Sequence, residues 1–79
     1  MLNAQDTLNR YYNEMRWRIL SLAADLDRVQ RADGGAALLA NDARLKSLRA
    51  CIEQLLLADP GRAERVQMIL SDMTPPPTR

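Results

Sequence analysis

The sequence lacks most of the residues that build chemical sites. It contains no histidine and a single cysteine, so it cannot supply the several thiolate or imidazole ligands of a zinc site. One cysteine also cannot form an internal disulfide, which excludes a small secreted scaffold held by disulfides. There is no glycine-rich phosphate loop and no Glu-x-x-His motif for a di-iron centre. These absences predict a protein that is not an enzyme and that carries no metal or cofactor.

Phenylalanine is absent too, and aromatic residues make up only 4% of the chain. The hydrophobic fraction of 47% comes mainly from aliphatic residues and Met, a composition that favours helices over strands. No apolar run approaches the roughly 20 residues that span a bilayer, and residues 1–12 lack the apolar core of a signal peptide. A formal charge of +1 gives no overall field that would attract nucleic acid or anionic lipid. We therefore expect a soluble cytoplasmic protein.

A continuous apolar repeat occupies the first part of the chain. From Leu8 to Val29, apolar residues recur at spacings that alternate between four and three, which indicates one helix with an unbroken apolar row. Such a row must be covered by other helices, so its central residues Ile19 and Leu22 are predicted to lie in the core. We call this row the seam, and it consists of Leu8, Tyr12, Met15, Ile19, Leu22, Leu26 and Val29.

The ends of this first helix carry recognisable signals. Asn3 and Asp6 are alternative N-caps, because either side chain can accept a hydrogen bond from an unpaired backbone N–H. The Asp-Gly-Gly run at 33–35 ends the helix, since glycine readily takes the left-handed conformation that closes a helix. The sequence thus predicts a helix over residues 4–32, with one short helical turn possible within 36–40.

A second helix is predicted over residues 42–57, with Asn41 or Asp42 as its N-cap. Its apolar stripe follows helical spacing and consists of Leu45, Leu48, Ile52 and Leu55, with Leu56 alongside. Cys51 lies at the margin of this stripe and has no histidine to activate it. It is therefore predicted to be a small packed residue rather than a nucleophile.

A third helix is predicted over residues 60–71. Asp59-Pro60 combines a capping carboxylate with a proline at the first helical position, which is a strong start signal. The apolar face of this helix carries Ala63, Val66, Ile69 and Leu70. The tail, residues 74–79, contains three consecutive prolines and is predicted to be disordered.

The helix lengths predict how the chain folds. A helix over 4–32 is a rod of roughly 40 Å, and the two shorter helices together match that length. The expected fold is therefore all-α, with two short helices folded back on the long one as a helical hairpin or three-helix bundle. This single domain covers residues 1–73. Two short helices cover a long rod only thinly, so we also expect a dimer.

A second apolar strip lies on the opposite side of the first helix. At 100° per residue, Trp17 falls nearly 180° from the centre of the seam, and Leu20 and Ala24 lie on the same side. The strip is either covered by a short helix inside the monomer or exposed as a docking patch. Tryptophan is enriched at binding hot spots, and both short helices fit the longer seam. The sequence therefore favours a partner interface at Trp17, Leu20 and Ala24, flanked by Arg16.

The segment from Asp59 to Leu70 resembles the second half of a helix-turn-helix motif, with Arg62, Arg65 and Gln67 as its polar residues. This resemblance implies a small nucleic-acid-binding regulator that uses the second and third helices. The link lacks the glycine-containing turn of that motif, however, and the preceding helix is long for it. Nucleic-acid binding is therefore kept as the alternative function.

The main prediction for the function is a small non-enzymatic protein–protein interaction or assembly module. It is expected to be homodimeric or bound to another protein, and not associated with a membrane.

Overall fold

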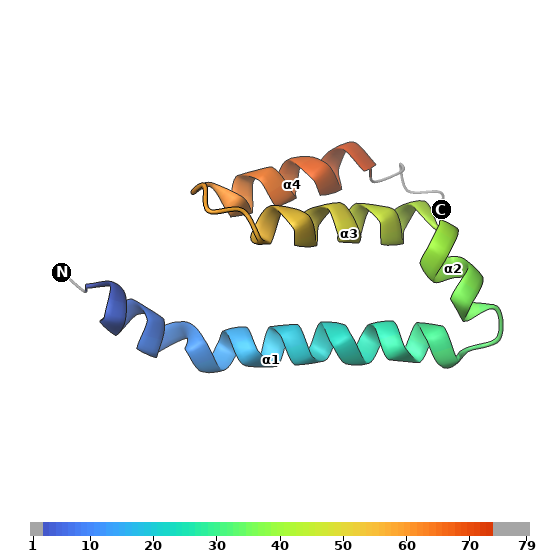
Figure 1. Cartoon of the computed structure of the whole chain (residues 1–79), viewed down its shortest axis with the longest axis horizontal. Coiled ribbons are helices and arrows are strands. Elements are labelled where there is room, and N and C mark those ends of the chain that lie inside the picture. Colours follow the sequence, from blue (N-terminus) through green and yellow to red (C-terminus); the bar gives the residue numbers. More distant parts are fainter. Residues whose placement is uncertain (1–2, 74–79) are drawn as a thin grey trace.

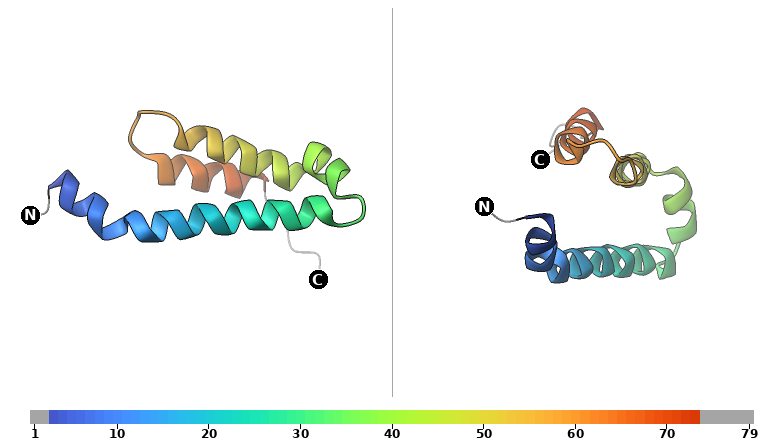
Figure 2. Two further views of the ribbon diagram at one scale, coloured as in Figure 1. Left: turned by 60° about the horizontal axis from the view of Figure 1, so that its bottom comes forward. Right: turned by 60° about the vertical axis from the view of Figure 1, so that its left-hand side comes forward.

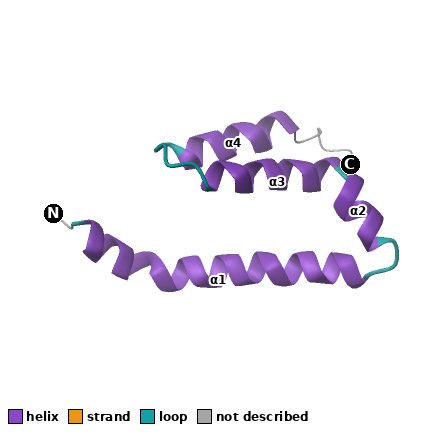
Figure 3. Ribbon diagram, viewed as in Figure 1, coloured by secondary structure: helices purple, strands orange, loops and turns teal. Residues whose placement is uncertain are grey.

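The computed structural model describes residues 3–73 and confirms an all-helical fold (Figures 1 and 3). No strand occurs between Asn3 and Met73. The predicted tail at 74–79 lies outside the described residues. The four helices, in chain order, are α1 (Ala4–Arg31), α2 (Gly35–Asn41), α3 (Ala43–Leu55) and α4 (Arg62–Met73).

The start of α1 and the corner after it follow the polar and glycine signals. Asn3 is the N-cap, and its Oδ1 accepts a hydrogen bond from the backbone N–H of Asp6 at 2.9 Å. The helix α1 ends at its C-cap Ala32, whose backbone is extended, and Gly34 takes a left-handed φ of 80° as the N-cap of α2. The left-handed glycine therefore begins the next helix, and the prediction that it closes α1 is wrong. Gly35 has a different role. It is buried against the end of α1, where an added Cβ would collide with the carbonyl oxygen of Val29.

The helices α3 and α4 form a closely packed hairpin. Asp42 caps α3, and its Oδ1 accepts from the backbone N–H of Arg44 at 2.8 Å. The face of α3 that meets α4 carries short side chains, and Ser47 and Cys51 are its two buried members. The Cys51 thiol points at the carbonyl oxygen of Val66 at 3.9 Å, so the prediction of a packed cysteine is confirmed.

The start of α4 differs from the prediction. Pro60 does not occupy the first helical position; the helix begins at Arg62, after Gly61 takes a φ of 87°. The guanidinium of Arg65 holds this loop by donating to the Pro60 carbonyl and to Gln54 Oε1, both at 2.7 Å. The turn therefore uses a left-handed glycine and an arginine clamp, where the sequence indicated a proline start. The link between α3 and α4 does contain a glycine turn, so the statement from the sequence that it lacks one is wrong.

The closed three-helix bundle expected from the sequence is not confirmed. Among residues 3–73, α1 comes close only to α2, while α2 also contacts α3 and α3 packs on α4. Figure 2 shows α1, α2 and the α3–α4 hairpin as three sides of an open frame. The radius of gyration is 15.5 Å, whereas a compact domain of this length has about 12 Å. The physical reason is that the apolar face of α4 packs on α3 and is not available to α1.

Candidate interaction surfaces

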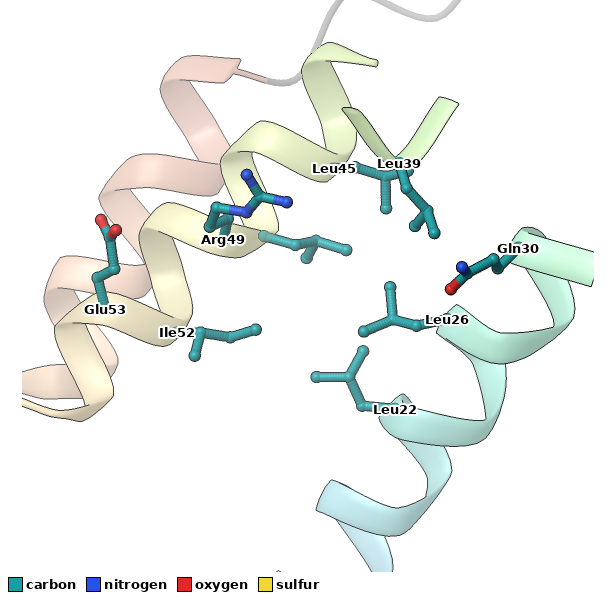
Figure 4. A pocket seen from close by; sticks show the side chains of 9 residues that line it. Leu22, Leu26, Gln30, Leu39, Leu45, Arg49, Ile52 and Glu53 are labelled. Atoms are coloured by element: carbon teal, nitrogen blue, oxygen red, sulfur yellow. The ribbon is translucent and has the colours of Figure 1, made fainter. Parts of the chain in front are cut away.

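An apolar cleft lies between α1 and α3, with α2 at its closed end (Figure 4). On one side, Leu22 and Leu26 of α1 point across the gap, and Leu45 and Ile52 of α3 point toward them. Its volume is about 330 Å³. We call it the α1–α3 cleft, and its lining consists of Leu22, Leu26, Gln30, Leu39, Leu45, Leu48, Arg49, Ile52 and Glu53.

The N-terminal half of the seam is not packed against another helix in the monomer, whereas Val29 at its other end is half-buried beside α2. From Leu8 to Ile19 every seam residue is exposed, with fractions between 43% at Met15 and 64% at Ile19. The prediction that Ile19 lies in the core is therefore wrong. Leu22 is half-buried at the cleft and not fully enclosed. Apolar packing reaches only the half of the seam nearest α2, because α3 does not approach α1 closely.

The second strip of α1 is also exposed. Trp17 is 66% exposed and Leu20 is 51% exposed, while Ala24 is half-buried. These three side chains border a shallow depression together with Ser21 and the ion pair between Asp25 and Arg28, whose atoms are 2.6 Å apart. The strip is thus not covered inside the monomer. Of the two alternatives that the sequence left open, burial under a short helix is excluded. Arg16 is exposed but does not line this depression.

One ion pair, between Asp42 and Arg44, stabilises the start of α3. The hydrogen bond from the Arg44 side chain, followed by that from the Arg44 backbone N–H, holds the pKa of Asp42 below its ordinary value of 3.8. Both oxygens of Asp42 accept from the Arg44 guanidinium at 3.1 Å. This pair lies at the start of α3, where a negative charge is favoured by the helix dipole. Its geometry stabilises a helix end and does not form a reactive site.

The arginines of the proposed helix-turn-helix resemblance are engaged in the α3–α4 loop. Arg62 donates to the Leu57 carbonyl at 2.5 Å and to the Leu55 carbonyl at 3.3 Å. Arg65 is half-buried and donates to Gln54 and to loop carbonyls. Gln67 is exposed. The two guanidinium groups therefore cap the C-terminal carbonyls of α3, and they are not presented together to a phosphate backbone.

The described part of the chain offers little else for chemistry. No group of three or more His, Cys, Asp or Glu residues between Asn3 and Met73 lies close enough to hold a metal ion. None of the helices in this range is both long and apolar enough to cross a membrane. The features that stand out are two exposed apolar surfaces on opposite sides of α1.

Sequence reasoning located the seam and the Trp17 strip but missed the cleft. It assigned the stripes of both short helices to the seam, whereas only α3 faces α1, across a gap. A signal for the true pairing was present in α3, where Ser47, Ala50, Cys51 and Gln54 form a row of short or polar residues at helical spacing. Such a row lets a neighbouring helix approach closely, and α4 is that neighbour.

No protein-family model, curated protein or solved structure matches this chain. Its class therefore follows from the geometry alone: a small all-helical protein with an open apolar cleft.

Proposed function

We propose that this protein is a non-enzymatic assembly module that forms a homodimer by burying the seam. The observation that supports this most directly is that the seam from Leu8 to Ile19 is exposed and runs into an apolar cleft. Apolar surface of this kind is stabilised when it is removed from water, by about 25 cal/mol per Å². The lone Cys51 is a buried free thiol, which suits the reducing cytoplasm as the place of action.

The exposed area supports a dimer. The chain exposes 6919 Å², whereas a compact folded monomer of 8.9 kDa exposes about 4,800 Å². The open frame formed by residues 3–73 contributes to this excess. A stable interface buries about 800 Å² from each partner, and exposed surface in an open frame is what such an interface would bury.

Nucleic-acid binding has less support. A binding surface for a phosphate backbone needs several free basic groups on one face. Arg62 and Arg65 are already hydrogen-bonded within the α3–α4 loop. The net charge of +1 adds no long-range attraction.

Sedimentation equilibrium tests the proposal. We expect a dimer at micromolar concentration, and Ile19→Asp should raise its dissociation constant at least a hundredfold, because burying an unpaired charge costs several kcal/mol. The matched control is Leu20→Asp, which places the same charge on the opposite face of α1 and should leave the dimer intact. A monomer of 8.9 kDa at hundreds of micromolar would refute the proposal. Dissociation by Leu20→Asp alone would move the interface to the Trp17 strip.

A further inference from the structure

We propose that the α1–α3 cleft is filled by the N-terminal half of α1 from a second copy of the chain. In this arrangement the two α1 helices are antiparallel, and Leu8 of one copy lies opposite Leu26 of the other. The inference rests on the proposed function, because it specifies how the homodimer is built. Each copy would complete the core of the other.

The cleft and the N-terminal half of α1 have complementary properties. The cleft is walled by leucine and isoleucine side chains and is open toward solvent. The N-terminal half of α1 carries four uncovered seam residues and extends past the α3–α4 loop in Figure 1. Both features belong to the same molecule, so a two-fold axis can satisfy both at once, as in a self-complementary interface.

No other element between Asn3 and Met73 can fill the cleft. The apolar face of α4, with Val66 and Ile69 half-buried, is already packed on α3. The short α2 already forms the closed end of the cleft through Leu39. A second α1 is therefore the best-matched occupant.

The spacing of the seam restricts how two copies can pair. Its steps alternate between four and three residues, and in an antiparallel pair a step of four must lie opposite a step of four for the side chains to meet in layers. Among registers that form at least two distinct layers, this condition holds for four. They place Leu8 opposite Ile19, Leu8 opposite Leu26, Tyr12 opposite Val29, or Ile19 opposite Val29.

Only the second register pairs all four exposed seam residues and both seam residues of the cleft. It leaves Val29 unopposed, but Val29 is already half-buried and lines a depression with Leu38 of α2. Pairing Ile19 with Val29 leaves the seam residues before Ile19 unopposed. Pairing Leu8 with Ile19 leaves Leu22 and Leu26 unopposed, so the cleft stays empty. Pairing Tyr12 with Val29 leaves Leu8 without an opposite residue in the seam. The second register also aligns the ends of the two α1 helices, because the two-fold axis that relates the copies passes near the midpoint of α1 (Ala4–Arg31). Its layers are Leu8 with Leu26, Tyr12 with Leu22, and Met15 with Ile19.

Disulfide trapping tests this register in the full-length chain with Cys51→Ala. The double variant Leu8→Cys/Leu26→Cys should form a covalent dimer upon mild oxidation. Within one helix these two positions are roughly 27 Å apart, far beyond the ~7 Å Cα separation that a disulfide tolerates, so any bond must join two copies. The matched control Arg10→Cys/Ala24→Cys has the same register on the opposite face and should give at least fivefold less covalent dimer.

The possible outcomes test the register of the two α1 helices separately from the proposal that the protein is a homodimer. Trapping by Leu8→Cys/Leu26→Cys, or by Tyr12→Cys/Leu22→Cys if the first pair impairs folding, supports the register. Stronger trapping by Leu8→Cys/Ile19→Cys or Tyr12→Cys/Val29→Cys would overturn the register and leave the dimer standing. Trapping by Leu8→Cys alone would indicate parallel helices and also overturn it. A chain that sediments as a monomer overturns both the register and the proposed function.

Discussion

Ser47 shows how a single residue can set the packing of two helices. It is buried in α3 on the side that faces α4, and its hydroxyl has no hydrogen-bond partner among the described residues. A buried hydroxyl without a partner loses its bonds to water and gains nothing in exchange. The residue is tolerated because its small size allows α4 to approach.

Replacing that hydroxyl should stabilise the protein. We expect Ser47→Ala to raise the free energy of unfolding by about 0.5–1 kcal/mol, through removal of the unpaired hydroxyl and a better helix propensity. Urea unfolding at a fixed chain concentration measures the change. Ser21→Ala, on an exposed face of α1, controls for propensity and should give a smaller gain. A loss of stability upon Ser47→Ala would show that the hydroxyl is satisfied in solution.

The two glycines of the α1–α2 corner should respond differently to alanine. An alanine Cβ at position 35 would collide with the Val29 backbone, so we expect Gly35→Ala to cost about 1–3 kcal/mol through displacement of α2. At Gly34 no heavy atom lies within 4 Å of the added Cβ, and only the left-handed φ opposes it, at a cost of about 1 kcal/mol. Thermal unfolding of both variants compares the two costs. An equal or smaller loss for Gly35→Ala would contradict the close approach.

At the scale of the elements, the sequence predicted which helices exist better than it predicted the residues at which they begin and end. The caps at Asn3 and Asp42 and the corner at Gly34 were visible because each depends on a local hydrogen bond or a local φ. The start of α4 was not visible, because the clamp by Arg65 involves Gln54, eleven positions earlier. Non-local contacts of this kind leave no periodic signal in the chain.

The cap of α3 should respond to acid. Its hydrogen bonds with Arg44 hold the pKa of Asp42 below 3.8, so the ionised form stabilises the folded state. That contribution is fully present above the unfolded value near 3.8 and is lost as the pH falls through the lower folded value. Circular dichroism should therefore show a fall in helicity below about pH 4. In Asp42→Asn, which retains a capping oxygen but cannot titrate, this fall should be smaller; an identical acid profile would exclude Asp42 as its source.

At the scale of the whole molecule, the sequence could not show which apolar faces meet. The seam, the α3 stripe and the α4 face were all identified, and any two of them could have been paired. The structure pairs α4 with the short-side-chain face of α3 and leaves the seam open. Pattern analysis ranks faces by hydrophobicity, whereas close packing also depends on how near two backbones can approach. The large seam residues keep a neighbour farther away than Ser47 and Cys51 do.

The two exposed surfaces of α1 should therefore be separable by mutation at Trp17. With Trp17 already 66% exposed, we expect Trp17→Ala to change the free energy of unfolding by less than about 0.5 kcal/mol. Under the proposed cleft interface it should also leave the dimer dissociation constant within about threefold, which is about 0.7 kcal/mol. Sedimentation equilibrium read beside thermal melts measures both quantities.

The alternatives for Trp17 give different results in the same experiments. If the Trp17 strip joined the two copies, truncating the indole would commonly cost 2 kcal/mol or more, which weakens association roughly thirtyfold. If the indole were buried in solution, the loss of stability would be about 3–5 kcal/mol. An unchanged dimer leaves Trp17, Leu20 and Ala24 on the outer surface of the assembly. A face that presents an indole beside the Asp25–Arg28 ion pair would then remain free for another protein, one of the two kinds of partner that the sequence left open for this strip.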